Sequence, residues 1–231
     1  MSNRPRLLLI RHGQGSLGTD NYDQLSPVGY VQSEKLGAHL ASVLDPASLV
    51  VCGHLQRHRQ TLDGLNINAP ARFDASLNEY TVDQLIRSAM DQADDLGLAV
   101  PDASAFDNPK AYLDTFLSWF PGVLSHWQAA RLVCQHNGRW PDFHARVCAP
   151  LGDWHRVISS GRSVLAVTSA GVISTMCAHA IGQPLGWQRE CNVSLYNASM
   201  TALSIDADGQ WQLDELNTIS HLDDAALHTL A

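Results

Sequence analysis

The sequence has no long apolar run and no excess of positive charge, and each absence excludes a class of function. No segment approaches the ~18 consecutive apolar residues that a transmembrane helix needs. The apolar stretch near the N-terminus, Leu7–Ile10, is shorter than the core of an export signal, which needs at least ~7 residues. Lys and Arg number 15 against 23 Asp and Glu, a formal net charge of −8, and no basic stripe for nucleic-acid binding is visible. We therefore expect a cytoplasmic protein whose partners are small soluble molecules, not nucleic acid or a membrane.

Closely spaced cysteine pairs are also missing. The five cysteines form no C-x-x-C pair, and an odd count without short spacings is typical of a reduced intracellular protein. One series invites a zinc assignment: Cys134, His136, His144 and Cys148. It lacks the C-x-x-C knuckles of structural zinc sites, so we interpret the spacing as coincidental and predict no metal or other cofactor.

What the sequence does contain is a short apolar run that ends abruptly in Arg11, His12 and Gly13. Four consecutive aliphatic residues, Leu7–Ile10, are typical of a strand buried on both faces of a parallel sheet. Ligands of open α/β sheets bind outside the carboxyl ends of such strands. The run therefore places a guanidinium and an imidazole where chemistry is usually performed. On these local residues alone, a histidine that merely ends a strand is an equal interpretation.

Further motifs follow in order along the chain: Leu25-Ser26-Pro27-x-Gly29, Leu55-x-Arg57-x-x-Gln60-Thr61, Leu77-x-Glu79 and the strand-turn-helix block from Val164 to Ile173. Together with Arg11-His12-Gly13, this ordered set resembles the histidine phosphatase superfamily, the phosphoglycerate mutase-like enzymes that pass a phosphoryl group through a histidine. The resemblance covers nearly the whole chain. It implies an α/β three-layer sandwich with a mainly parallel sheet flanked by helices and an inserted helical cap.

The resemblance also implies a role for each residue at these motifs. His12 would be the nucleophile, and neutral imidazole is competent near neutral pH because its reference pKa is about 6.5. Arg11 and Arg57 would bind the phosphate, since guanidinium groups match phosphate oxygens with paired hydrogen bonds. Glu79 would protonate the leaving alcohol, which requires a raised pKa.

Arg57 and Glu79 each have an interpretation that involves no catalytic role. Arg57 would otherwise be a solvated helix cation in a surface cluster with His58 and Arg59. Glu79 would otherwise be a surface carboxylate that precedes a loop. The spacing of both within the ordered motif set favours the pocket.

One position departs from the family pattern, because the second pocket histidine would fall at Ser169. A serine hydroxyl brings no positive charge, and the loss of one oxyanion donor slows a reaction ~10² to 10³-fold. Ser169 is still expected to bind phosphate, with the helix N-terminus near Ala170 as a second source of donors. Gln14 is expected to bind phosphate or to shape its own loop. Another histidine, with His54 as the first candidate, would compensate unless it lies at the surface.

Residues 1–231 are expected to form one domain with a cap inserted at about residues 80–138. Aromatic residues in that segment, among them Phe116, Trp119 and Phe120, are expected to pack it onto the core rather than to contact substrate. A helix is predicted from Pro141 to about Ser159, disturbed near Pro150.

The sequence favours a phosphomonoester hydrolase that acts on a small phosphorylated metabolite through a phosphohistidine at His12. A binding protein of the same fold, which recognises a phospholigand without turnover, is the alternative that Ser169 suggests. A phosphoglycerate mutase-type phosphotransferase is a further alternative, although the sequence shows no second phosphate site. The substrate and the oligomeric state, monomer or homodimer, stay open.

Overall fold

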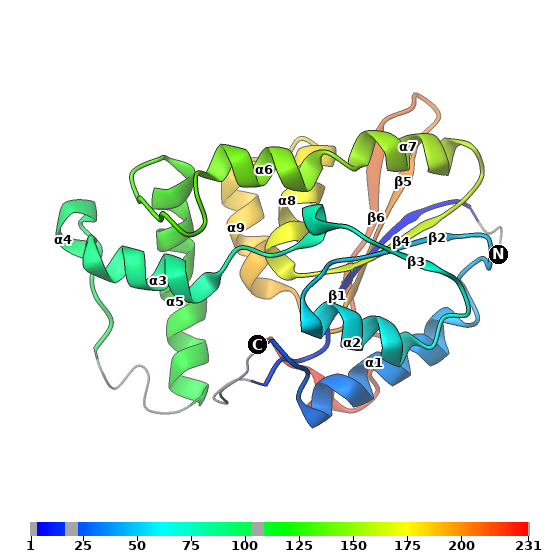
Figure 1. The fold of residues 1–231 in the computed structure, drawn as a ribbon, viewed down its shortest axis with the longest axis horizontal. Coiled ribbons are helices and arrows are strands. Elements are labelled where there is room, and N and C mark those ends of the chain that lie inside the picture. Colours follow the sequence, from blue (N-terminus) through cyan, green and yellow to red (C-terminus); the bar gives the residue numbers. More distant parts are fainter. Residues whose placement is uncertain (1–3, 17–22, 103–108, 231) are drawn as a thin grey trace.

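The computed structural model describes residues 4–16, 23–102 and 109–230, and in this part of the chain six strands form one sheet in the order β3-β2-β4-β1-β5-β6 (Figure 1). The strands are β1 (Leu7–Arg11), β2 (Leu49–Cys52), β3 (Ala71–Phe73), β4 (Val164–Thr168), β5 (Met200–Ile205) and β6 (Trp211–Thr218). The first four are parallel, whereas β5 pairs antiparallel with β1 and β6 antiparallel with β5. The predicted α/β sheet is confirmed, with an antiparallel hairpin at one edge.

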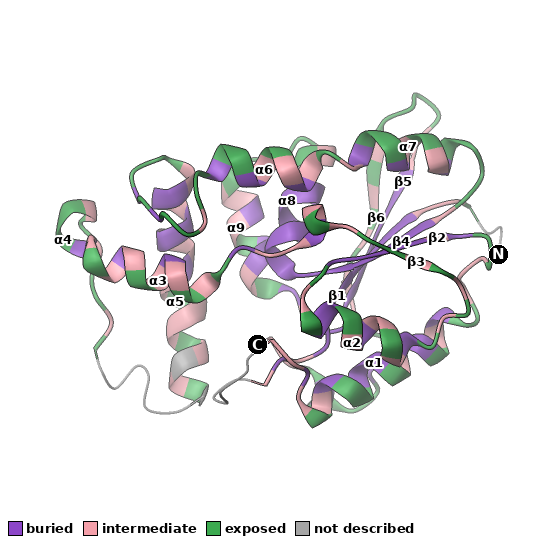
Figure 2. Ribbon diagram, in the orientation of Figure 1, coloured by how far each residue is buried: buried purple, intermediate pink, exposed green. Residues whose placement is uncertain are grey.

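Helices cover both faces of this sheet. They are α1 (Pro27–Leu40), α2 (Gln56–Leu65), α3 (Val82–Asp91), α4 (Ala93–Leu96), α5 (Pro109–Gln128), α6 (Trp140–Cys148), α7 (Leu151–Ser159), α8 (Ala170–Ala180) and α9 (Leu185–Ser194), with 3₁₀ turns at Ala75–Leu77 and Ala225–Leu227. Side chains of β1 alternate between two cores: Leu8 and Ile10 pack with α1 and α2, and Leu7 and Leu9 with the helices of the opposite face. Figure 2 shows the resulting buried sheet between two helical layers. The predicted three-layer sandwich is therefore confirmed.

The register of the central strands brings distant parts of the sequence together. Arg11 at the end of β1 lies opposite Thr168 at the end of β4. Neighbouring strands lie ~4.8 Å apart, so the next residues, His12 and Ser169, emerge side by side. The backbone N–H of Gly53, just after β2, donates to Val167 O at 3.1 Å and brings the start of α2 to the same edge.

Local sequence signals account for the ends of several helices. Ser26 caps α1 by accepting a hydrogen bond from the N–H of Gly29, and Pro27 takes the first helical position, as predicted. The single helix expected from Pro141 to Ser159 is instead two helices, α6 and α7, separated at Pro150. Proline cannot donate a backbone hydrogen bond, which accounts for the interruption.

The segment from residue 80 to residue 138 contains α3, α4 and α5, which extend beyond one end of the sheet (Figure 1). Phe120 and Trp127 of α5 are fully buried, and the Tyr80 ring packs edge-on against Trp127, with ring centroids 5.3 Å apart. Phe120 and Trp127 belong to the same core as Leu7 and Leu9 of β1, so the predicted packing onto the core is confirmed for these two residues. Among the helices that the structure describes, none is both long and apolar enough to span a membrane.

We predict that Gly37→Ala destabilises the protein by about 1–3 kcal/mol, the usual cost of overpacking. A Cβ at Gly37 would lie 2.4 Å from the carbonyl oxygen of Leu65, where α1 crosses α2. Gly152 in α7 is a matched control, because a Cβ there would meet nothing within 4 Å. Gly152→Ala should be neutral or add up to about 1 kcal/mol. Urea unfolding measures both, and equal stability of the two variants would contradict the prediction.

Candidate active site

The site begins at the carboxyl ends of β1 and β4, where His12 and Ser169 are 3% and 1% exposed. The N–H of His12 donates to Thr168 O at 2.9 Å, which continues the strand pairing by one residue. The N–H of Gly13 donates to the Thr61 hydroxyl at 3.0 Å, and that hydroxyl donates to Arg57 O at 2.7 Å. The backbone around His12 is therefore fixed on both sides.

The hydrogen bonds of His12 define its tautomer. Nδ1 lies 2.7 Å from the carbonyl oxygen of Gly13, which can only accept, so Nδ1 carries the proton. The Nε–H of Arg57 donates to His12 Nε2 at 3.2 Å, so Nε2 presents a lone pair. Burial is the main reason that the pKa of His12 is lowered well below 6.5, and the charges of Arg57 and Arg11 lower it further. The imidazole is neutral, and its Nε2 lone pair is directed at the guanidinium of Arg57.

Arg57 is only 8% exposed and contacts His12, so it lies beside the imidazole and not in a solvated surface cluster. Its Nη1 forms a 2.7 Å ion pair with Asp23 Oδ1, and Asp23 Oδ2 accepts the N–H of Gln56 at 2.9 Å. Asp23 lies in the polar loop after β1 and belongs to no motif, so the sequence gives no signal for its contact with Arg57. This carboxylate positions Arg57 at the first turn of α2.

Arg11 brings a second positive charge but is held differently from the expectation. Its Nη2 donates to Leu230 O at 2.8 Å, and its Nη1 donates to Leu195 O. These carbonyls come from segments 184 and 219 residues further along the chain, and neither has a sequence signature. The charge of Arg11 nevertheless lowers the pKa of both His12 and Glu79.

Glu79 reaches the same region from the loop after β3. Its Oε2 accepts the N–H of Gly171 at 2.7 Å, and its Oε1 accepts the N–H of Tyr80 at 3.1 Å. Removal from solvent raises the pKa of Glu79, although the Gly171 N–H and the charge of Arg57 act in the opposite direction. The N–H of Gly171 in the first turn of α8, expected to offer a donor to phosphate, is thus occupied by this carboxylate.

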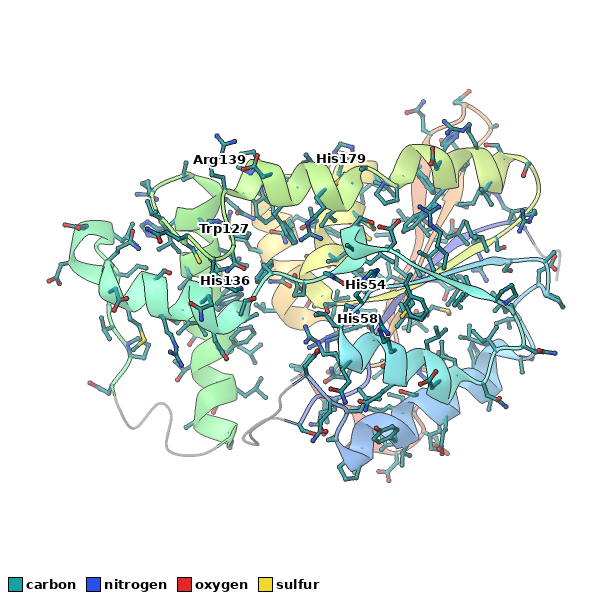
Figure 3. All side chains as sticks on the ribbon, in the orientation of Figure 1. His54, His58, Trp127, His136, Arg139 and His179 are labelled. Carbon is teal, nitrogen blue, oxygen red and sulfur yellow. The ribbon has the colours of Figure 1, made fainter. Side chains whose placement is uncertain are left out.

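A histidine does lie beside Ser169, but it is His58 and not His54. His54 is exposed and meets Phe73 edge-on, with ring centroids 6.2 Å apart. His58 is fully buried, and its Nε2 lies 2.7 Å from Ser169 Oγ. Both are labelled in Figure 3 at the start of α2. The surface placement that the sequence left open for His54 is thus confirmed. The surface cluster for His58 is corrected: consecutive residues of a helix point ~100° apart, so His58 is buried while its neighbour Arg59 is exposed.

Gln14 is engaged within its own loop. Its side-chain oxygen accepts the Ser26 hydroxyl at 2.8 Å, and its N–H donates to Gln32 Oε1 at 2.8 Å. These contacts join the loop after β1 to the start of α1. A role for Gln14 in phosphate binding stays a prediction.

Metal-ligating side chains gather at a different place. His144 and Cys148, one turn apart on α6, and His179 on α8 offer ligand atoms within 4.8 Å of one another. In Figure 3, His179 lies beside α6, apart from His58 at the start of α2. Cys134 and His136, the other two residues of the sequence series, are not part of this group among the described residues.

Fold and site together define a phosphatase-like α/β protein that gathers a histidine, two arginines and a glutamate at the carboxyl edge of its sheet. The chain belongs to the histidine phosphatase superfamily (branch 1), whose family model matches residues 7–99 and 116–219. No curated protein matches the chain.

Solved structures with the same fold include several phosphatases. The alpha-ribazole phosphatase from Shigella flexneri is 20% identical, with a TM-score of 0.60 over 93% of this chain and 96% of that one. The mycobacterial glucosyl-3-phosphoglycerate phosphatase is 22% identical, with a TM-score of 0.61 over 93% and 99%. A phosphoserine phosphatase mutant from Entamoeba histolytica is 15% identical, with a TM-score of 0.62 over 94% and 99%. At these identities the likeness establishes the fold, here over nearly the full length of each chain.

Proposed function

We propose that this protein is a phosphomonoester hydrolase that acts through a phosphohistidine at His12. The observation that carries the proposal is the 3.2 Å hydrogen bond from Arg57 Nε to His12 Nε2. It supports a buried, neutral imidazole whose Nε2 lone pair accepts from Arg57 and so points to the place where that guanidinium would hold a phosphoryl group. Membership of the superfamily and the phosphatase folds of its structural neighbours add to this support.

The reaction follows from the arrangement of these groups. His12 Nε2 attacks phosphorus and forms a P–N bond while the ester P–O bond breaks. Glu79 gives its proton to the leaving oxygen, and Arg57 and Arg11 stabilise charge on the phosphoryl oxygens. Water then attacks phosphorus, the P–N bond breaks, and Glu79 recovers a proton from that water. The products are an alcohol and inorganic phosphate.

The substrate is proposed to be a small phosphorylated metabolite. The three structural neighbours are named as phosphatases of phosphoserine, alpha-ribazole and glucosyl-3-phosphoglycerate, and the charges of Arg57 and Arg11 both act on the one imidazole of His12. Release of phosphate from a panel of such esters by the wild-type protein tests the proposal. A protein that binds phosphate without turning over any ester would instead be the phospholigand-binding protein that Ser169 suggests.

The pH dependence of kcat/KM should be bell-shaped. His12 must be neutral, so the acid limb reports its pKa, which lies below 6.5. Glu79 must be protonated, so the alkaline limb reports its pKa, which lies above the usual 4.5. Glu79→Gln should remove the alkaline limb and lower kcat ~10² to 10⁴-fold for alkyl phosphates, whose leaving oxygen needs a proton. An aryl phosphate with an acidic leaving group should lose much less, and equal losses for both substrates would contradict the role of Glu79.

A further inference from the structure

We propose that His58 and Ser169 act together in place of a second histidine in the site. The His58 imidazole is hydrogen-bonded to the Ser169 hydroxyl, and this hydroxyl stabilises the phosphoryl group. The inference rests on the proposed phosphatase function and identifies a positioning residue for it. His58 acts through Ser169, whose hydroxyl donates to the phosphoryl group during transfer.

The two side chains come from different elements and meet beneath the site. His58 belongs to the first turn of α2, and Ser169 occupies the N-cap position of α8 at the end of β4, where its side chain makes no capping hydrogen bond. His58 Nε2 and Ser169 Oγ are 2.7 Å apart, and neither residue is more than 1% exposed. The rings of His58 and His12 lie with centroids 5.6 Å apart. A pair this close to the predicted nucleophile and this deeply buried belongs to the site.

The direction of the hydrogen bond follows from the other ring nitrogen. Among the described residues, no donor or acceptor pairs with the buried Nδ1 of His58. A buried N–H without a partner is costlier and rarer than an unpaired acceptor, so the proton belongs on Nε2, which donates to Ser169 Oγ. The serine hydroxyl then directs its own proton elsewhere, and no acceptor for it occurs among the described residues. Hydrogen bonds in such a chain polarise one another, which strengthens the outer donor.

The backbone holds the imidazole in place. A Cβ at Gly53 would lie 2.2 Å from His58 Nδ1, so only glycine lets the ring sit against the turn after β2. Because His58 Nε2 lies 2.7 Å from Ser169 Oγ, a longer side chain that extends from residue 169 in the same direction would meet the His58 ring. We therefore do not expect the single change Ser169→His to speed turnover, although it would introduce the imidazole that the family pattern has at this position.

The test moves the imidazole from one residue to the other. His58→Ala should lower kcat ~10²-fold, as expected for loss of a transition-state donor, while KM changes little. Ser169→His alone should also lose activity because the rings collide. The double variant His58→Ala/Ser169→His should exceed both single variants in kcat, a non-additive result that shows coupling. His54→Ala, which removes an exposed histidine just before α2, is the control and should match the wild type.

Two further measurements keep the test decisive. Vanadate, which resembles the phosphoryl group in transfer, should lose affinity in His58→Ala by a larger factor than inorganic phosphate does. Ser169→Ala removes only a hydroxyl and should give the same preferential loss of vanadate even if His58→Ala folds poorly. Thermal unfolding monitors folding of every variant.

The outcomes separate this inference from the proposed function. Suppose that the wild type hydrolyses esters and that both His58→Ala and Ser169→Ala keep its kcat and vanadate affinity. The proposed role of His58 and Ser169 is then wrong, and the proposed phosphatase function is retained. Suppose instead that the wild type hydrolyses no ester but binds vanadate only when both residues are present. The proposed phosphatase function is then wrong, and His58 and Ser169 are retained as an anion-binding pair. If the wild type neither hydrolyses esters nor binds vanadate, both are wrong.

An independent observation supports a second inference: we infer that His144, Cys148 and His179 bind a zinc ion. Nitrogen and sulfur are ligands that Zn²⁺ prefers, and three protein ligands leave a fourth position open. The Cys148 Sγ and the His144 Nε2 are 3.8 Å apart, and the two histidine rings meet edge-on with centroids 5.1 Å apart. A cavity of about 290 Å³ adjoins the two histidines and offers space for a water or ligand in the fourth position.

Titration of the protein with Co²⁺ tests this site, because cobalt bound by a thiolate gives an ultraviolet charge-transfer band. We expect one equivalent to bind, Zn²⁺ to displace it, and the Cys148 thiol to release its proton. Cys148→Ser should abolish the band, whereas Cys134→Ser, the same change at a buried cysteine outside the group, should leave it unchanged. A missing band, or a band that survives Cys148→Ser, would overturn the site.

Discussion

Replacement of His12 by alanine is expected to lower kcat by ~10⁴-fold or more, because removal of a nucleophile leaves only binding and charge stabilisation. A wild-type protein quenched during turnover of a radiolabelled phosphate ester should carry label that is stable to alkali and lost in acid, as a phosphohistidine is. The label should be absent from His12→Ala. The fold should survive, since the hydrogen bond from the backbone N–H of residue 12 to Thr168 O does not need the side chain.

The interpretation of this experiment depends on a second histidine variant. His54→Ala removes an exposed imidazole and should leave both the label and kcat unchanged. A label that persists in His12→Ala would show that another group attacks phosphorus. Loss of activity with wild-type phosphate affinity would be consistent with the proposal, because Arg57 still binds the anion.

The buried strands and the approach of His12 and Arg57 were accessible from the sequence, for physical reasons. Apolar runs such as Leu7–Ile10 are long enough and sufficiently bounded to identify buried strands. Parallel strands end at the same edge of the sheet, so residues that follow them converge. This is why His12 and Arg57 could be placed together although 45 residues separate them.

The partners that hold these residues were not accessible in the same way. Arg11 is held by the carbonyl oxygens of Leu195 and Leu230, and every residue has a carbonyl, so no sequence pattern marks these two. Asp23 is similar, since acidic residues are common in loops and only the folded chain brings this one to Arg57. Contacts of this kind depend on tertiary packing and leave little trace in local composition.

His58 shows how a local pattern can mislead. Beside Arg57 and Arg59 it looks like part of a solvated basic cluster, and Arg59 is indeed exposed. The rotation of ~100° per residue separates these three neighbours onto different faces of α2. His58 is directed at Ser169, so the residue that departs from the family pattern and the residue that was passed over are in contact. The effect of serine at position 169 therefore has to be considered together with His58, which lies next to it.

Arg57→Ala is expected to lower kcat/KM ~10³-fold or more, the effect seen when a guanidinium that stabilises phosphoryl transfer is removed. Arg57→Lys keeps the charge but loses the planar donor that reaches His12 Nε2, so it should recover only part of this loss. Arg59→Ala is the matched control, because Arg59 is exposed and its guanidinium lies 4.7 Å from the Phe73 ring centroid. It should leave kcat/KM within a factor of about two, as surface substitutions usually do.

Arg57 should also affect the pH profile, and the sign follows from its charge. A cation beside an imidazole disfavours protonation, and Arg57 contributes to the lowered pKa of His12 after burial. Its removal therefore raises the pKa of His12 and moves the acid limb of kcat/KM to higher pH. Arg57→Lys should shift that limb less, since a positive charge remains nearby. An acid limb that stays in place, or moves to lower pH, in Arg57→Ala would mean that the guanidinium does not act on the imidazole, and the site as described would lose the interaction on which the proposed chemistry depends.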